Sequence, residues 1–197
     1  MCSSDLVRNH IEWLLNLPYN ISTEDNLDFA SVKETLDKSH YGLEDIKNRI
    51  IEYLVVANRQ KNAPIICLVG PPGVGKSTMA RSIANSLNKK FVKLSVGGLD
   101  DISTLIGHRK TYIGSYPGKI IQLIRKCECN NPLFLIDEVD KIGNSYKGDP
   151  SAVLLDILDK EQNSHFQDNY IEEEFDLSKV MFILTADRKS TRLNSSH

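Results

Sequence analysis

The strongest chemical signal in this sequence is a loop with the spacing G-x-x-x-x-G-K-S. Its residues, with the next one along the chain, are Gly70, Pro71, Pro72, Gly73, Val74, Gly75, Lys76, Ser77 and Thr78. Glycines at this spacing let the backbone curl around a chain of phosphates, so that N–H groups and a helix N-terminus point at anionic oxygens. Lys76 would reach the β- and γ-phosphates, and Ser77 would place its hydroxyl on Mg²⁺. The motif predicts a nucleoside triphosphate site, against the plainer alternative of a glycine-rich turn.

Two adjacent carboxylates supply a second signal. Asp137 and Glu138 directly follow residues 133–136, an apolar run that is typical of a buried strand. In open α/β sheets, ligands bind at the carboxyl ends of the strands. Together with the phosphate loop, this position predicts that Asp137 holds the magnesium ion, mostly through water, and that Glu138 polarises the water that attacks the γ-phosphate. The alternative is a strand end with two solvated acids.

Both signals need strands that end at a common edge. Residues 65–69 form an apolar run before the loop, and Met79, Ile83 and Leu87 recur at helical spacing after it. Further strands are predicted at 91–96, 133–136 and 179–185, and a loop is predicted at 161–176. Helices are predicted at 7–17 and within 22–39, and three more helices are predicted to begin at residue 43, at Pro117 and at Asp149–Pro150. This alternation predicts an α/β fold, a phosphate-loop domain whose mostly parallel sheet carries helices on both faces, preceded by a short helical segment.

Two segments outside the phosphate loop and the acidic pair each allow two interpretations. Tyr41 and Leu43 open a helix upstream of the phosphate loop, where nucleotide-binding folds often place the purine. They could wall an adenine pocket, or they could form a capping turn and core. Tyr112 and Ile113 lie in a loop flanked by glycines and preceded by basic residues. They could contact a ligand or polypeptide, or Tyr112 could fold back onto its own domain.

Composition describes an ordinary globular chain of 197 residues, with 41% hydrophobic residues, 25% charged residues and a net charge of -2. This charge implies no broad attraction to nucleic acid or to an anionic membrane surface. A membrane helix is not expected, because no apolar run approaches the roughly 20 residues that it needs. A secretory leader is not expected either, because residues 1–20 lack a basic region followed by an apolar region. The spacing of Cys2, Cys67, Cys127 and Cys129 fits neither a disulfide framework nor a zinc site, so we expect reduced thiols inside a cell.

Several motifs occur together in one order. They are the phosphate loop, the sequence GHRKTYIG at 107–114, the sequence LFLIDEVDK at 133–141 and the tripeptide Gly148-Asp149-Pro150. The upstream segments EWL at 12–14, LPYN at 17–20 and HYGL at 40–43 precede them. From about Val7 to Ala186, the chain resembles the ATPase module of Lon, the ATP-dependent AAA+ protease. Several motifs in order are more specific than a phosphate loop alone.

The resemblance implies a function and partners. Tyr112 and Ile113 would correspond to the pore loop that grips unfolded or damaged protein and pulls it through a homohexameric ring, and Tyr41 and Leu43 would touch the adenine of ATP. ATP and Mg²⁺ are the implied ligands, with no nucleic acid or membrane, in the cytoplasm or alternatively in an organelle such as the mitochondrial matrix. The family's arginine finger, helical lid and Ser-Lys peptidase pair have no counterpart within these residues.

The ends of the chain depart from the family. Where the family has Asn after the last strand, this chain has Asp187, and the residues that follow do not continue the pattern. We therefore expect foreign or disordered residues at 187–197 and at 1–6, a helical segment at 7–39, and the ATPase domain at 40–186.

Two other functions share these motifs. One is an ATPase that remodels DNA or protein complexes, of the clamp-loader or helicase-loader kind, which the net charge and the lack of a basic stripe disfavour for DNA. The other is an assembly module that binds nucleotide without hydrolysing it.

Overall fold

The computed structural model describes residues 3–59, 65–112, 114–143 and 149–187. The helices in these ranges are α1 (Ser3–Leu15), α2 (Phe29–Ser39), α3 (Glu44–Arg59), α4 (Lys76–Ser86), α5 (Ser103–Ile106), α6 (Lys119–Cys127) and α7 (Pro150–Leu158), with short 3₁₀ turns η1 (Val139–Lys141) and η2 (Asn163–His165). The strands are β1 (Ile66–Gly70), β2 (Phe91–Ser95), β3 (Leu133–Asp137), β4 (Phe166–Gln167), β5 (Glu174–Phe175) and β6 (Met181–Asp187). No helix in the described ranges combines the length and apolar character needed to cross a bilayer.

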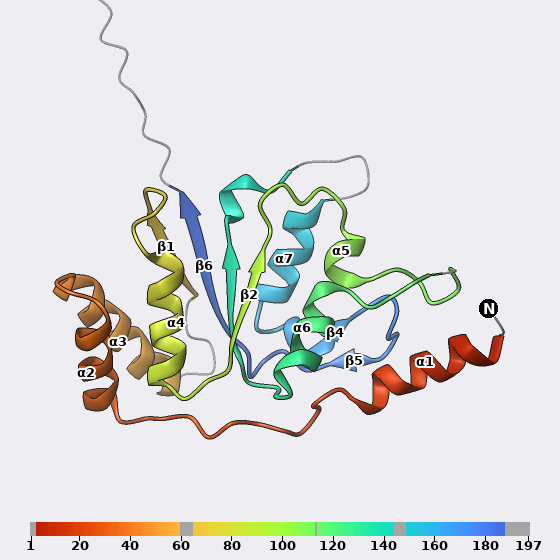
Figure 1. Ribbon diagram of the computed structural model, residues 1–197, viewed down its shortest axis with the longest axis horizontal. Coiled ribbons are helices and arrows are strands. Elements are labelled where there is room, and N and C mark those ends of the chain that lie inside the picture. Colours follow the sequence, from red (N-terminus) through yellow and green to blue (C-terminus); the bar gives the residue numbers. More distant parts are fainter. Residues whose placement is uncertain (1–2, 60–64, 113, 144–148, 188–197) are drawn as a thin grey trace, which may run out of the picture.

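Four strands form a parallel sheet in the order β1-β6-β3-β2. Because all four run in the same direction, their carboxyl ends meet at one edge, the upper one in Figure 1. β6 lies between β1 and β3, so the end of the last described strand separates the two predicted motifs. The predicted α/β fold with a mostly parallel sheet is confirmed.

Two apolar cores cover the two faces of this sheet. On one face, α2, α3 and α4 pack against Leu133, Leu135 and Ile183. On the other face, α6 and α7 pack against side chains that include Phe134 and Ile136. Figure 1 shows these helices on opposite sides of the strands. Alternate residues of β3 therefore face opposite cores, which explains why this strand is a continuous apolar run.

The expected start of one helix was wrong, and so was the expectation of a loop at 161–176. The helix expected from Pro117 begins at Lys119, because Gly118 has an extended backbone (φ −65°, ψ 163°) and its N–H binds the side chain of Asp168 instead. The segment 161–176, predicted to be a loop, contains η2 and the antiparallel pair β4–β5. The predicted cap of α7 is correct, since Asp149 accepts a hydrogen bond from the Ser151 N–H and Pro150 is the first helical residue.

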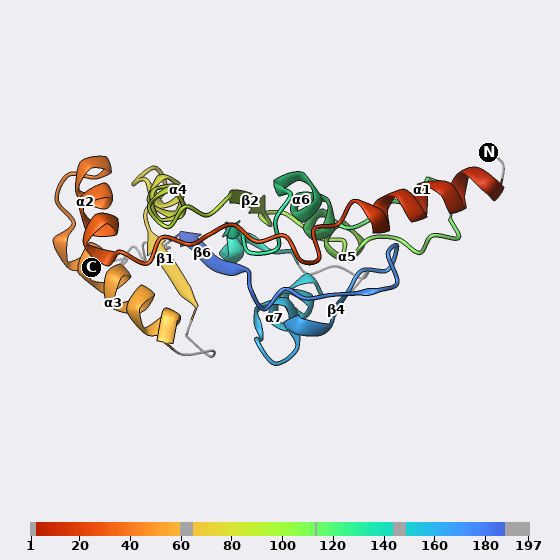
Figure 2. The same cartoon turned by 90° about the horizontal axis from the view of Figure 1, so that it is seen from below.

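Residues 16–28 cross the amino edge of the sheet between α1 and α2, as both views show (Figures 1 and 2). Two buried asparagines after α6 hold this segment, which we call the strap. Asn130 donates to the Tyr19 carbonyl at 2.8 Å, and Asn131 both accepts from the Thr23 N–H and donates to the Thr23 carbonyl at 2.8 Å. The helical segment before the domain is thus bound to the domain by matched amide and backbone groups.

Candidate nucleotide site

The phosphate loop joins β1 to α4 through two left-handed glycines. Gly73 has φ +80° and Gly75 has φ +87°, a region that residues with a side chain rarely adopt. Gly75 caps α4, and no side chain there satisfies the first free N–H groups of the helix. Those N–H groups and the helix dipole therefore favour an anion at this point.

Lys76 is the first residue of α4, and its ammonium lies over the loop. It donates to the Gly70 and Pro71 carbonyls, both at 2.8 Å, and pairs with Asp187 at 2.9 Å. Its side chain is largely shielded from solvent. The loop therefore holds a positive charge at its centre, where the predicted phosphates would lie.

Asp137 lies at the end of β3, opposite the start of α4. One carboxylate oxygen pairs with Lys93 of β2 at 2.5 Å and lies 3.4 Å from the Ser77 hydroxyl, and the other accepts from the Thr185 hydroxyl. Burial raises the pKa of Asp137, but these hydrogen bonds and the charge of Lys93 outweigh burial and leave the pKa below its ordinary value. The group is a carboxylate at neutral pH.

Glu138 has a left-handed backbone with φ +63°, which is uncommon for a residue with a side chain and is typical of functional sites. Its carboxylate pairs with Lys141 at 2.6 Å, and the Ser95 hydroxyl lies 3.4 Å away. A Cβ at position 97 would lie 2.5 Å from a Glu138 oxygen, so Gly97 leaves the space that this carboxylate occupies. The left-handed backbone and the space beside Gly97 together fix the position of the partly exposed Glu138 carboxylate at the carboxyl edge of the sheet.

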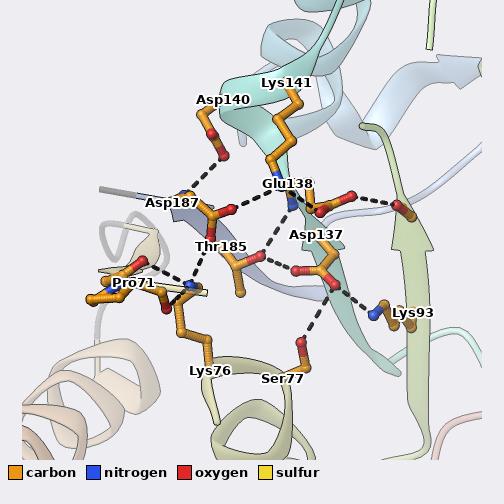
Figure 3. Close-up of polar contacts among 12 residues, drawn as sticks. Pro71, Lys76, Ser77, Lys93, Asp137, Glu138, Asp140, Lys141, Thr185 and Asp187 are labelled. Atoms are coloured by element: carbon orange, nitrogen blue, oxygen red, sulfur yellow. Dashed lines mark hydrogen bonds and ion pairs between the residues drawn. The ribbon is translucent and has the colours of Figure 1, made fainter. Parts of the chain in front are cut away.

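Asp187, the last residue of β6, joins the two halves of the site (Figure 3). Its carboxylate binds Lys76 at 2.9 Å and Lys141 at 2.8 Å, and its N–H donates to Asp140. Hydrogen bonds from Lys141 and Lys76 lower the pKa of Asp187. The residue thus occupies the space between the phosphate loop and Glu138, within β6 and one residue beyond the expected end of the domain.

The predicted phosphate-site and acidic residues therefore come together from β1–α4 and the end of β3, and β6 adds Thr185 and Asp187 beside them. Sequence reasoning missed Thr185 as a partner of Asp137, and it missed Lys93 and Lys141 as partners of the two acids. A lysine inside an otherwise apolar strand was the available signal for Lys93. The position of Lys141 three residues after Glu138 was the available signal for the second lysine.

A cavity of about 480 Å³ continues from the phosphate loop to the amino end of α3. Its lining includes Leu43, Val74 and Met79, and also His40 and Arg49, which the sequence had not indicated. The cavity is mostly apolar, which suits a purine ring. Leu43 thus lies where a base would be, whereas the side chain of Tyr41 is fully exposed and is not among the lining residues.

The loop between α5 and α6 presents Tyr112, whose side chain is 63% exposed. Tyr112 does not fold back onto the core, so its aromatic surface is available to another molecule. Ile113, its predicted companion, lies outside the described residues. Figure 1 shows this loop projecting from the side of the domain opposite α2 and α3.

The donor set fits a magnesium ion that is shared with phosphate. Ser77 and Asp137 supply one hydroxyl and one carboxylate within 3.4 Å of each other, and both are hard oxygen donors. No group of three or more His, Cys, Asp or Glu in the described ranges forms a closed metal cage. An ion here would need oxygens from phosphate and water to complete its shell, as Mg²⁺ in phosphoryl-transfer sites does.

Comparison with known proteins agrees with this geometry. Residues 66–195 match the family described as "ATPase family associated with various cellular activities (AAA)". The chain is 54% identical to Lon protease from Bacillus thuringiensis (strain Al Hakam) and 52% identical to Lon protease 1 from Bacillus subtilis (strain 168), in each case over 95% of this chain and 24% of the relative. Lon protease from Malacoplasma penetrans (strain HF-2) is 56% identical over 91% of this chain and 23% of the relative. The chain thus spans about a quarter of the length of these relatives.

Proposed function

This chain belongs to the AAA family of ATPases, and we propose that it is the ATPase module of a Lon-type protease, in which ATP hydrolysis drives the unfolding and translocation of protein substrates. Membership of the family implies that the chain binds a nucleotide. The observation that carries the proposal is the meeting of Lys76 and Ser77 with Asp137 and Glu138 at one edge of the sheet.

The residues of the phosphate loop bind the triphosphate in this proposal. The free N–H groups at the start of α4 donate to phosphate oxygens, and Lys76 exchanges Asp187 for the β- and γ-phosphates. Residues from Gly70 to Thr78 form the cradle, and Leu43 contacts the adenine. Tyr41 takes part only if its exposed ring turns toward the base.

Ser77 and Asp137 would hold Mg²⁺, and the ion would supply positive charge that neutralises the phosphates. Glu138 then acts as the base that orients and polarises the attacking water. In the nucleotide-free chain, Lys141 holds the Glu138 carboxylate by a 2.6 Å ion pair. We therefore infer that Glu138 must leave Lys141, or share it, to reach the water.

The similarity to Lon proteases and the exposure of Tyr112 support a proposal for the substrate and the assembly. We propose that Tyr112 and Ile113 grip unfolded protein in the pore of a homohexamer formed by the whole protein, because Tyr112 is exposed on a projecting loop. A cytoplasmic location is proposed, with an organelle matrix as the alternative. The three described cysteines, Cys67, Cys127 and Cys129, are free thiols, which agrees with a reducing compartment.

A substitution of Glu138 tests the proposal. E138Q keeps the size of the side chain and removes its basicity, so binding of a fluorescent ATP analogue should be unchanged while the single-turnover rate of phosphate release falls by about a hundredfold or more. Equal rates for both proteins would support the assembly module that does not hydrolyse ATP. Absence of nucleotide binding by the unmodified chain would contradict the whole proposal.

The similarity to Lon proteases does not favour a clamp-loader or helicase-loader function. Salt-sensitive DNA binding by the purified chain would revive that function, since phosphate contacts weaken steeply with salt.

A further inference from the structure

Asp168 is a buried carboxylate that the nucleotide site does not use. It lies between β4 and β5, has an exposure of 0%, and contacts no lysine or arginine in the described residues. One carboxylate oxygen accepts from the Gly118 N–H at 2.7 Å. The other accepts from the N–H groups of Tyr170 and Ile171 at 2.8 and 3.1 Å. Burial raises the pKa of Asp168, and these three donors oppose that effect.

These bonds connect the β4–β5 hairpin to the base of the Tyr112 loop, which we define as residues 107–118. Asp168 binds the end of the loop at Gly118. Its neighbour Asn169 binds the start, where the Asn169 N–H donates to the Ile106 carbonyl at 2.7 Å and the side-chain amide donates to the Gly107 carbonyl at 3.1 Å. Both ends of the loop are therefore held by two consecutive residues.

The two ends of the loop approach each other so closely that only glycine fits at positions 107 and 118. A Cβ on Gly107 would lie 2.8 Å from the Gly118 nitrogen and 2.9 Å from an Asp168 oxygen, and a Cβ on Gly118 would lie 2.0 Å from the Leu105 carbonyl oxygen. Farther out, Lys110 pairs with Glu172 of the hairpin at 2.6 Å. The loop thus leaves the domain from a fixed, narrow base while Tyr112 stays exposed.

We propose that Asp168 is the positioning residue of the Tyr112 loop, because its carboxylate fixes the base of the loop and thereby sets where Tyr112 meets a polypeptide. This inference rests on the proposed function, in which Tyr112 grips protein. The role depends on both oxygens being acceptors. In D168N, one of them becomes an NH₂ group, which faces an N–H donor of Gly118 or of Tyr170 and Ile171 and cannot bind it.

The test compares four forms of the chain: the unmodified chain, D168N, I171V and Y112A. I171V is the matched control, because it removes a buried methylene group from the same hairpin and lowers stability without changing the carboxylate or its backbone donors. Three properties are measured on each: amide hydrogen exchange, affinity for MgADP, and affinity for a fluorescein-labelled, permanently unfolded casein in the presence of an ATP analogue.

We expect D168N to speed exchange of residues 107–118 by about tenfold, through local opening, with no such change in α4 or β3. Affinity for the unfolded casein should fall by about fivefold, since a loop that is no longer preorganised costs ordering on binding. MgADP affinity should stay the same, and I171V should keep both the loop protection and the casein affinity.

Two results overturn the inference. One is unchanged exchange of residues 107–118 in D168N. The other is a loss of protection and casein affinity that I171V reproduces, because Asp168 would then act only through overall stability. If Y112A binds casein as well as the unmodified chain, the proposed grip by Tyr112 is wrong. In that case the exchange data still decide whether Asp168 holds the loop.

Discussion

At the carboxyl edge of the sheet, charged side chains hold one another, whereas at the amino edge two uncharged asparagines hold the strap. The charged groups are Lys76, Lys93, Lys141, Asp137, Glu138 and Asp187. Several of them are partly exposed, and each pair joins a lysine to a carboxylate. A phosphate could replace the carboxylate, and a metal ion or a water could replace the lysine. Exposed ion pairs contribute little to stability, so exchanging their partners is easy.

Asn130 and Asn131, by contrast, are only 2% and 6% exposed, and they bind backbone groups of the strap. Other contacts also hold the strap against the domain, including the ion pair between Lys89 and Asp25 of the strap at 2.8 Å. Removing such an amide leaves partly buried backbone groups unpaired, which costs more than the bond contributed. The comparison indicates that one edge is built to exchange partners and the other to keep them.

The largest expected effect is on binding at the carboxyl edge. K76M removes the central ammonium of the phosphate loop and keeps the aliphatic stem, so affinity for MgATP should fall by about a hundredfold, since hydrogen bonds to charged groups are the strong ones. Isothermal calorimetry measures this change. The melting temperature should hardly move, and a large drop in it would show that Lys76 is structural as well.

The amino edge should show the opposite pattern. N131A should lower the free energy of unfolding by about 1–2 kcal/mol, because it unpairs the partly buried N–H and carbonyl of Thr23. Urea denaturation measures this loss. N16A is the control, since the Asn16 side chain donates an exposed hydrogen bond to the Glu12 carbonyl in the last turn of α1. Nucleotide affinity should be unchanged, and a parallel loss of affinity would mean that the two edges are coupled.

A smaller effect is expected where a carboxylate competes with phosphate. Asp187 holds both Lys76 and Lys141. D187N removes the negative charge that competes for Lys76, and affinity for MgATP should rise by about fivefold, which is the order of the energy of a single ion pair near the surface. Affinity for MgADP should rise less, because the γ-phosphate is the group nearest this position in the proposed site. Equal gains for both nucleotides would argue against that placement.

The smallest expected effect is a dependence of stability on pH. The pKa values of Asp137 and Asp187 are lowered in the folded chain, from an ordinary value of 3.8. A carboxylate with a lowered folded pKa adds stability above the unfolded pKa, and that stability is lost as the pH falls through the folded value. Thermal melting between pH 6 and pH 3 should therefore show a loss below about pH 4. In K93M, Asp137 loses its counter-charge but keeps the hydrogen bonds from Thr185 and Ser77, so its share of this loss should shrink.

The pattern of strands and helices was largely predictable, because apolar runs and helical spacing are local properties of the sequence. The cap at Asp149 and Pro150 was predictable for the same reason. Pro117 was misread because a proline suits the first turn of a helix, yet a distant carboxylate, Asp168, takes the N–H of Gly118. The antiparallel pair β4–β5 was missed because each of these strands has only two residues, which is too short to show an alternating apolar pattern.

In the site, the phosphate loop and the two acids can be recognised from local sequence, since the spacing of neighbouring residues fixes their chemistry. The side chains that complete the site depend on the fold. The strand order β1-β6-β3-β2 places Thr185 against Asp137, and the β2–β3 pairing brings Lys93 to the same carboxylate. Such contacts join residues far apart in the chain, and the free energy that selects them comes from burying both faces of the sheet, which no local pattern records.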